Sequence, residues 1–232
     1  MTGTPPTRPV VEARGLYHIY RERGVETVAL RGAEIVLEPG TWTSLVGPSG
    51  SGKSTLVHVL AGLIEPSGGS VLIEGSDLTR LPPEERALCR RRRIGVVVQR
   101  DNLHPLLDVH ANVGLTLRLD SQPDPLVDGR VTELLAQVGL ADRARQPVRQ
   151  LSGGEAQRVA IAAALAIRPA VLLADELTGE LDETTTLEIL TLLNTVMRDE
   201  ATTLLTVTHN PLVAASADRR LVMQDGLVVD AA

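Results

Sequence analysis

The sequence is poor in cysteine and in aromatic residues. Among its 232 residues there is one cysteine, Cys89, with one tryptophan, two tyrosines and no phenylalanine. A single cysteine cannot form an internal disulfide and does not predict a zinc site, which is consistent with a reducing compartment. Because aromatic residues make up only 1% of the chain, it has almost no means of stacking the bases of a single-stranded nucleic acid.

An excess of positive charge is also missing. The formal net charge is −6 and the pI is about 5.4, whereas a protein that mainly holds nucleic acid needs a basic face. We interpret the one basic run, Arg90 to Arg93, as the solvated end of a helix that leads into a strand over 94–99. We therefore expect no nucleic-acid partner.

Long hydrophobic runs are absent too. Although 43% of the residues are hydrophobic, no stretch approaches the roughly 18 apolar residues that a membrane helix needs. The first residues, MTGTPPTRPV, lack the apolar core of a signal peptide, and we expect a flexible start over 1–9. We predict one domain over residues 1–232, on the cytoplasmic side of the cell.

The pattern of strands and helices is typical of an α/β protein. Short β-branched runs broken by glycines over 10–46 predict antiparallel strands. The runs 170–174 and 202–208 are apolar almost throughout, as in parallel strands that are buried on both faces. Helix-like patches at 111–119 and 129–138, separated by prolines, predict a mainly helical insertion over about 99–165.

The segment GPSGSGKST matches the phosphate-binding pattern G-x-x-x-x-G-K-[ST] in full, between a predicted strand and a predicted helix. Its glycines let backbone N–H groups wrap around phosphate oxygens, and the following helix adds its positive end. Lys53 is suited to the β- and γ-phosphates, and Ser54 to Mg²⁺. The predicted ATP-binding residues here are Gly47, Pro48, Ser49, Gly50, Ser51, Gly52, Lys53, Ser54 and Thr55.

This motif completes the fold prediction. A strand, a phosphate loop and a helix in that order indicate a P-loop NTPase core. Together with the segments above, the sequence predicts an α/β fold with such a core, an antiparallel β subdomain and an inserted α-helical subdomain.

Two further motifs lie at the ends of predicted elements. One places two carboxylates at the end of a strand, and the other places two glycines at the start of a helix. The apolar run 171–174 ends in Asp175 and Glu176, at the sheet edge where α/β proteins bind ligands. Alone, such a pair is more often a helix cap or turn; beside a phosphate loop it predicts Asp175 for Mg²⁺ and Glu176 for polarising the attacking water. The run LSGGEAQR at 151–158 reads as an ordinary capped helix start, yet a glycine-rich helix N-terminus is also a second phosphate site.

In their order and spacing these motifs resemble those of the ATP-binding cassette (ABC) ATPases, over about residues 11–230. The runs VVVQRDNLHP and ADELTGELD are similar to the bacterial lipoprotein-release and macrolide-export type, whose relatives drive cell-division and antimicrobial-peptide permeases. The motifs that carry the resemblance are the phosphate loop, Gln99, LSGGEAQR, VLLADE, Leu181-Asp182 and Thr208-His209.

The resemblance implies a head-to-tail pair of subunits with two ATP molecules between them. Each ATP would lie between the phosphate loop of one subunit and Ser152, Gly153 and Gly154 of the other, and Asp182 would bridge the subunits. The resemblance also implies a separate membrane permease, contacted through about Arg100–Val113 at the cytoplasmic face of the membrane. Direction and cargo would be set outside this chain.

The resemblance assigns four further residues to the ATP site. Tyr20 takes the place of the aromatic ring that stacks on adenine, with Val28 beside it, although a lone tyrosine in a β segment is as often a half-buried strand residue. Gln99 would sense Mg²⁺ and the attacking water. His209 would hold the γ-phosphate, although outside this context it would more often be a core or capping histidine.

The chain departs from the family pattern at four places. Leu177 replaces a usual proline, Glu180 an asparagine, Ala163 an arginine and Ala111 a glutamate, and none of these removes a catalytic group. The charge of Glu180, near the γ-phosphate and the subunit interface, would slow hydrolysis or alter closure of the pair, and we hypothesise a working but slower enzyme.

Two other functions remain open besides a transport ATPase. One is a regulatory ATPase that signals through a membrane partner to a cell-wall enzyme. The other is a soluble DNA-repair type ATPase, which is disfavoured because no coiled-coil arm fits between Lys53 and Leu151.

Overall fold

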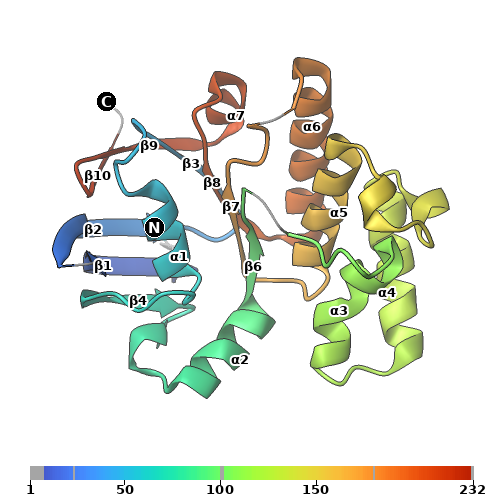
Figure 1. Cartoon of the computed structure of the whole chain (residues 1–232), viewed down its shortest axis with the longest axis horizontal. Helices are drawn as coiled ribbons and strands as arrows, with labels where there is room; N and C mark the ends of the chain where they lie inside the picture. Colours follow the sequence, from blue (N-terminus) through green and yellow to red (C-terminus); the bar gives the residue numbers. More distant parts are fainter. Residues whose placement is uncertain (1–7, 23, 100–101, 180, 231–232) are drawn as a thin grey trace, which may run out of the picture.

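The computed structural model describes residues 8–22, 24–99, 102–179 and 181–230. Most of the predicted flexible start, together with Arg100 and Glu180, lies outside these described residues. The remaining chain forms two β-sheets and a group of helices (Figure 1). Among the described helices, none combines the length and the hydrophobicity needed to cross a membrane.

The smaller sheet is antiparallel and contains parts of the chain that flank the phosphate loop. Its central pairs join β1 to β2 and β1 to β4, and both pairs are antiparallel. The predicted antiparallel subdomain is thus confirmed, and it also recruits a strand from beyond the loop. In spatial order the strands are β2 (Val25–Leu37), β1 (Val11–Glu22), β4 (Gly68–Ile73) and β5 (Ser76–Asp77).

The larger sheet is parallel except at one edge. Every residue of β7 and β8 is buried, as the two apolar runs predict for strands covered on both faces. Among the described strands of this sheet, only β10 pairs in the antiparallel sense, with β9. In spatial order the strands are β10 (Leu227–Asp230), β9 (Arg219–Gln224), β3 (Trp42–Val46), β8 (Thr203–Val207), β7 (Val171–Asp175) and β6 (Ile94–Val97).

The helices confirm the predicted insertion. In Figure 1, α3 and α4 lie at one end of the larger sheet, beyond β6, and α3 packs against both α4 and α5. Short 3₁₀ turns at Leu78–Arg80, Ala141–Arg143 and Val148–Gln150 connect elements. The α-helices are α1 (Lys53–Leu60), α2 (Pro83–Arg93), α3 (Val109–Leu119), α4 (Asp124–Gln137), α5 (Gly153–Leu165), α6 (Glu183–Glu200) and α7 (Pro211–Ser216).

Two hydrophobic cores place the phosphate loop between the sheets. One core joins α1, through Leu56 and Leu60, to buried residues of both sheets. The other joins the inserted helices to α6 and to Trp42 of β3, whose indole N–H donates to the Thr206 hydroxyl at 3.0 Å. The start of α1 is therefore held at the carboxyl end of β3, where a ligand of an α/β sheet binds.

Arginines of the run at the end of α2 bind carbonyl and carboxylate groups of the same chain. Arg90 donates to the Gly62 carbonyl at 2.9 Å, and Arg91 and Arg92 each lie 3.0 Å from a carboxylate oxygen of Asp120. These contacts fit the interpretation of this run as a helix end that needs no ligand.

Candidate nucleotide-binding site

Two glycines let the phosphate loop pass close to neighbouring backbone. Gly47 has φ 155°, and a Cβ atom there would lie 2.2 Å from the Met223 carbonyl oxygen of β9. Gly52 has φ 105°, and its Cβ would lie 2.4 Å from the Ala29 carbonyl oxygen of β2. No side chain fits at such distances, so the loop is shaped by backbone from both sheets.

Lys53 bends back over this loop. Its ammonium group donates to the carbonyl oxygens of Gly47 and Pro48, at 2.9 and 2.8 Å. Lys53 is also the first residue of α1, and Gly52 before it supplies no capping side chain. The first N–H groups of α1 therefore have no capping acceptor and are available, with the ammonium group, for an anion.

A cavity of about 500 Å³ opens above the loop. This size is typical of sites for small molecules and cofactors. Pro48 and Ser51 belong to the loop but do not line the cavity. Thr27 and Ala29 do line it, as the neighbours of Val28 on β2. Their residue types carry no signal that predicts this. The lining residues are Tyr20, Thr27, Val28, Ala29, Gly47, Ser49, Gly50, Gly52, Lys53, Ser54, Thr55, Gln99, Glu176 and His209.

Tyr20 stands at the open edge of the cavity. Its side chain is partly exposed, and its hydroxyl lies 3.3 Å from the Thr55 hydroxyl at the start of α1. The His18 ring meets the Tyr20 ring edge to face, with 4.5 Å between the centroids. These contacts hold a flat apolar face beside the loop, which suits a nucleotide base. Stacking on adenine stays a prediction.

Gln99 reaches the cavity because β6 ends early. The predicted strand over 94–99 stops at Val97, because the Asn102 side chain takes both backbone groups of Val98: its Oδ1 accepts from the N–H at 2.8 Å and its amide donates to the C=O at 2.6 Å. These bonds replace a sheet partner. Gln99 leaves the sheet here and lines the cavity with its exposed side chain.

Asp175 ends β7 as a buried carboxylate. It is only 5% exposed, and its Oδ1 atom has no hydrogen-bond partner among the residues that the structure describes. Burial raises the pKa of Asp175 above its ordinary value, while the nearby Ser54 hydroxyl and Lys53 ammonium lower the pKa by less. An unpartnered carboxylate oxygen close to a serine hydroxyl is a set of hard oxygen donors, which is what Mg²⁺ requires. The residues present therefore fit the predicted metal.

Glu176 adopts a backbone conformation that is rare for a residue with a side chain. Its φ is 55°, in the left-handed region, and its N–H donates to the Val207 carbonyl oxygen at 2.9 Å. A left-handed residue other than glycine costs about 1–2 kcal/mol, and such strain is concentrated at functional sites. The turn carries the Glu176 side chain away from β7 and into the cavity.

The Glu176 carboxylate meets His209 there. Its Oε2 lies 2.9 Å from His209 Nδ1, but the approach lacks hydrogen-bond geometry, so this buried oxygen has no donor within the described part of the chain. The two residues follow the carboxyl ends of the neighbouring strands β7 and β8. The site thus has an acceptor available for the proton of a water molecule.

The glycine-rich segment before α5 lies outside this cavity. The Ser152 hydroxyl accepts from the Glu155 N–H at 3.2 Å, and the Glu155 carboxylate accepts from the Ser152 N–H at 2.8 Å, which is a capping box. Ser152 and Gly153 are exposed to solvent. None of the predicted residues Ser152, Gly153 and Gly154 reaches the phosphate loop of its own chain.

Asp182 also lies outside the cavity, where it begins α6. Its carboxylate accepts from the N–H of Thr185 at 2.9 Å and from the Thr185 hydroxyl at 2.8 Å, and these bonds lower the pKa of Asp182. Thr185 in turn touches the glycine-rich segment: a Cβ atom at Gly154 would lie 2.5 Å from Thr185 Cγ2. The structure thereby joins two motifs that sequence reasoning treats separately. Leu177, in place of the usual proline, is buried in the core beneath the helices.

The comparisons with known proteins agree with this site. The family model of the ABC transporter matches residues 30–179. The chain is 40% identical to the lipoprotein-releasing system ATP-binding protein LolD of Hyphomonas neptunium, over 96% of this chain and 98% of that protein. It is 42% identical to the methionine import ATP-binding protein MetN 2 of Pseudomonas aeruginosa, over 95% of this chain and 66% of that protein.

A solved structure matches the whole fold. A bacterial ABC transporter cassette, solved as a dimer, superposes with a TM-score of 0.87 at 35% identity, over 94% of this chain and 96% of the cassette. The same cassette in a post-hydrolysis state, bound to ADP and phosphate, superposes equally well. The chain therefore belongs to the ABC transporter family, as an ATP-binding subunit that hydrolyses ATP to energise transport.

Proposed function

We propose that two copies of this chain pair head to tail around two ATP molecules and drive a separate membrane permease of the export or lipoprotein-release type. One observation carries the pairing. The capped start of α5, with Ser152 and Gly153 exposed, lies outside the cavity that holds the phosphate loop. A helix N-terminus that faces solvent with glycines at its tip is suited to a phosphate, and a second copy can supply one.

In this proposal each group of the cavity has one task. ATP binding draws the Lys53 ammonium from the Gly47 and Pro48 carbonyls to the β- and γ-phosphates, where it forms stronger, charge-assisted contacts. Glu176 polarises the attacking water through its unpartnered oxygen, and His209 holds the γ-phosphate. The base stacks on Tyr20, beside Val28.

We assign Mg²⁺ to Ser54, Asp175 and Gln99. The unpartnered Oδ1 of Asp175, close to the Ser54 hydroxyl, supports this assignment. When bound, the ion neutralises charge on the phosphate oxygens. Burial raises the pKa of Asp175 more than the nearby Lys53 ammonium lowers it, so this buried carboxylate favours binding of a further cation.

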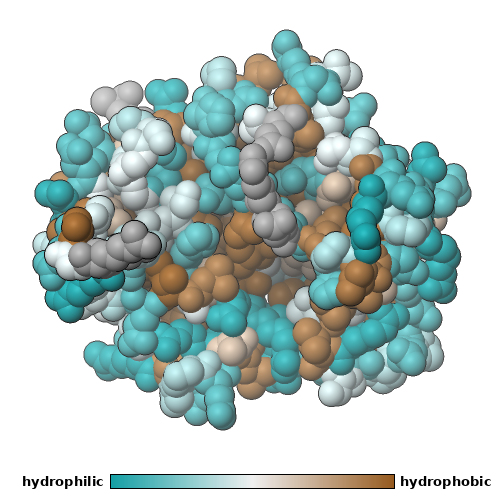
Figure 2. All heavy atoms as spheres, viewed as in Figure 1, coloured by the Kyte–Doolittle hydropathy of each residue, from teal (hydrophilic) through white to brown (hydrophobic). Residues whose placement is uncertain are grey.

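The permease contact is proposed at a groove of about 290 Å³ that begins where the predicted contact segment 100–113 leaves β6. Figure 2 shows hydrophobic surface on the two sides of a hollow between the α2 side and the α3–α4 side of the molecule. Leu115, Leu119 and Ala163 line the groove, with Asn102 and His104 from the contact segment. Arg100 and Asp101, at the start of that segment, lie outside the described residues.

The type of transporter rests on likeness alone. LolD is named for lipoprotein release, and the chain matches nearly all of its length. MetN 2 is named for import and is about as similar in sequence. The proposal of export or lipoprotein release therefore rests on the similarity of the runs VVVQRDNLHP and ADELTGELD to that type. A peripheral place at the cytoplasmic face of the membrane follows from the permease contact and belongs to the same proposal.

Affinity purification from detergent-solubilised membranes tests the proposed partner. A tagged Glu176→Gln chain, supplied with ATP, is expected to retain a permease with several membrane spans, because slow hydrolysis keeps the pair closed. The same tagged chain with Leu115→Glu added carries a charge in the groove. This variant should lose the permease while still binding ATP. If both variants retain the same membrane proteins, the groove is not the contact; if neither retains one, the transporter proposal is wrong.

A further inference from the structure

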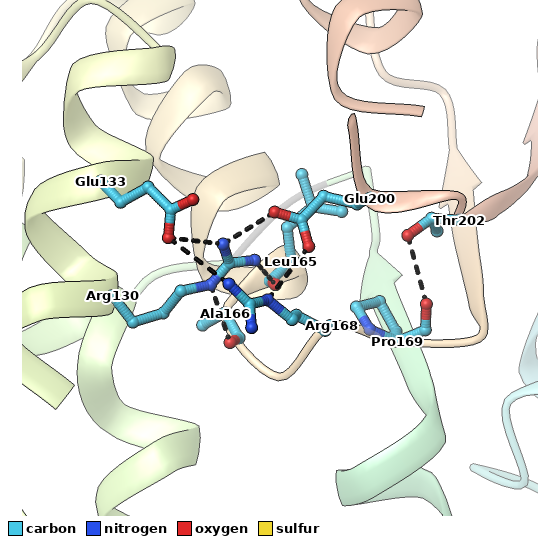
Figure 3. A network of polar contacts seen from close by, with 8 residues as sticks. All are labelled: Arg130, Glu133, Leu165, Ala166, Arg168, Pro169, Glu200 and Thr202. Carbon is cyan, nitrogen blue, oxygen red and sulfur yellow. Dashed lines mark hydrogen bonds and ion pairs between the residues drawn. The ribbon is translucent and has the colours of Figure 1, made fainter. Parts of the chain in front are cut away.

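A network of charges with a buried central pair joins the inserted helices to α6 (Figure 3). At its centre the Arg130 guanidinium, on α4, lies 2.7 Å from Glu200 Oε1 at the end of α6. The two side chains are only 8% and 7% exposed. Glu133 on α4 and Arg168 after α5 complete the network, with Glu133 3.0 Å from Arg130 and Arg168 3.3 Å from Glu200. Two cations and two anions thus alternate: Arg130 and Glu200 are buried, whereas Glu133 and Arg168 are partly exposed to solvent.

The same guanidinium also holds the last turn of α5. Arg130 donates to the carbonyl oxygens of Leu165 and Ala166, at 2.9 and 3.3 Å (Figure 3). These carbonyls belong to the end of α5, where the last carbonyl groups of a helix have no N–H donor within the helix and carry partial negative charge. One side chain therefore fixes three helices: its own, the end of α5 and the end of α6.

Stability alone does not explain a buried ion pair. Its desolvation cancels much of the attraction, and apolar residues of similar volume are often as stable. Its geometry, in contrast, is restrictive, because the planar guanidinium must meet Glu200 and two carbonyls at once. The opposite end of α5 is its start, next to Ser152. Because α5 has 13 residues, its two ends lie about 20 Å apart. A tilt of about 5° at the anchored end would move the Ser152 end by nearly 2 Å.

We propose that Arg130 is a positioning residue: with Glu200 it anchors the end of α5 to α6 and thereby sets where Ser152 is presented to the nucleotide of the second subunit. The inference rests on the proposed head-to-tail pair. It predicts that loss of the network weakens pairing and leaves ATP binding to the single chain unchanged, because no residue of the network lines the ATP cavity.

The test uses the full chain with Glu176→Gln, so that hydrolysis does not open the pair. Sedimentation velocity with ATP measures the dissociation constant of the pair, and a fluorescent ATP analogue at high dilution measures binding to the single chain. The variants are Arg130→Met and the double variant Arg130→Met/Glu200→Met, in which no charge of the central pair is left unpartnered. Arg118→Met is the matched control, because Arg118 pairs with Asp128 within the inserted helices.

For both network variants we expect the dissociation constant of the pair to rise about tenfold. Mutations that act on the coupling between distant sites typically change it by about 2- to 30-fold. Binding to the single chain should stay within about twofold of the parent, and the double variant should regain the parent's melting temperature. Arg118→Met should match the parent in every measurement. If Arg130→Met does not fold, the double variant carries the test.

Parent-like pairing of the double variant would show that the network is only structural and would overturn the inference. An equal loss of pairing in Arg118→Met would overturn it too. If the Glu176→Gln parent itself stays monomeric with ATP, the head-to-tail proposal fails, and this inference fails with it.

Discussion

A methyl group at Gly154 tests the contact between the two motifs that face the second subunit. In Gly154→Ala the new Cβ would lie 2.5 Å from Thr185 Cγ2, well inside van der Waals contact. The Thr185 side chain cannot turn away freely, because its hydroxyl donates to Asp182 at 2.8 Å. Either that bond breaks or the start of α5 moves away from α6.

The expected cost follows from two opposing effects. Forcing an extra methyl group into a packed contact costs about 1–3 kcal/mol, whereas alanine for glycine within a helix contributes up to about 1 kcal/mol of stabilisation. We expect a net loss of about 1–2 kcal/mol in the free energy of unfolding, which for a chain of this size lowers the melting temperature by about 2–8 °C. ATP-driven pairing should weaken as well, since Gly154 and Asp182 both face the proposed partner.

Thr185→Ser provides the matched control, because it removes Cγ2 and keeps the hydroxyl that Asp182 holds. Urea unfolding of the two single variants and the double variant gives the coupling between the sites. In the serine background Gly154→Ala should no longer destabilise the protein. If the loss persists unchanged in that background, the steric reasoning is wrong; the same holds if Gly154→Ala is as stable as the parent.

Two further variants test the ATP site. Burial raises the pKa of Asp175, so the folded chain keeps this proton to higher pH than the unfolded chain; the stability that the group contributes is present below its ordinary pKa and is lost as pH rises through the raised pKa. Asp175→Asn cannot ionise, so in the presence of EDTA it should be more stable than the parent at neutral pH, and by less at acidic pH. With Mg²⁺ in place of EDTA it should hydrolyse ATP far more slowly than the parent. If the variant and the parent unfold identically at neutral pH, this reasoning is wrong. Tyr20→Ala should weaken ATP binding about tenfold, the loss of one stacked base, in an equilibrium fluorescence titration. Tyr17→Ala, an exposed tyrosine on the same strand that does not line the cavity, should bind ATP like the parent, and equal effects of the two variants would remove the stacking assignment.

The elements that carry the chemistry were predictable because their signals are local. A phosphate loop needs glycines where a Cβ would strike backbone, as at Gly47 and Gly52, and it must join a strand to a helix. The strands β7 and β8 are buried throughout and nearly continuously apolar, so they could be identified without their neighbours. Asp175 and Glu176 then follow at the correct sheet edge.

Other features depend on contacts that no local pattern encodes. The early end of β6 is caused by Asn102, four residues beyond Val98. On the sequence Arg130 is an ordinary helix residue, and its partner Glu200 lies 70 positions away. One signal was present: Glu200 places a negative charge at the C-terminal end of α6, where the helix dipole disfavours it. The ion pairs with Arg130 and Arg168 explain this charge.

A mixing experiment tests the central claim, that each ATP site is built from two chains. Lys53→Ala removes the phosphate-binding lysine and Ser152→Phe blocks the start of α5, so each variant alone should hydrolyse almost no ATP. In an equal mixture about half of the pairs are mixed, and each mixed pair holds one intact site, so up to about a quarter of the parent rate should return. A mixture as inactive as its components, or a Ser152→Phe chain that hydrolyses ATP at the parent rate, would contradict the shared site.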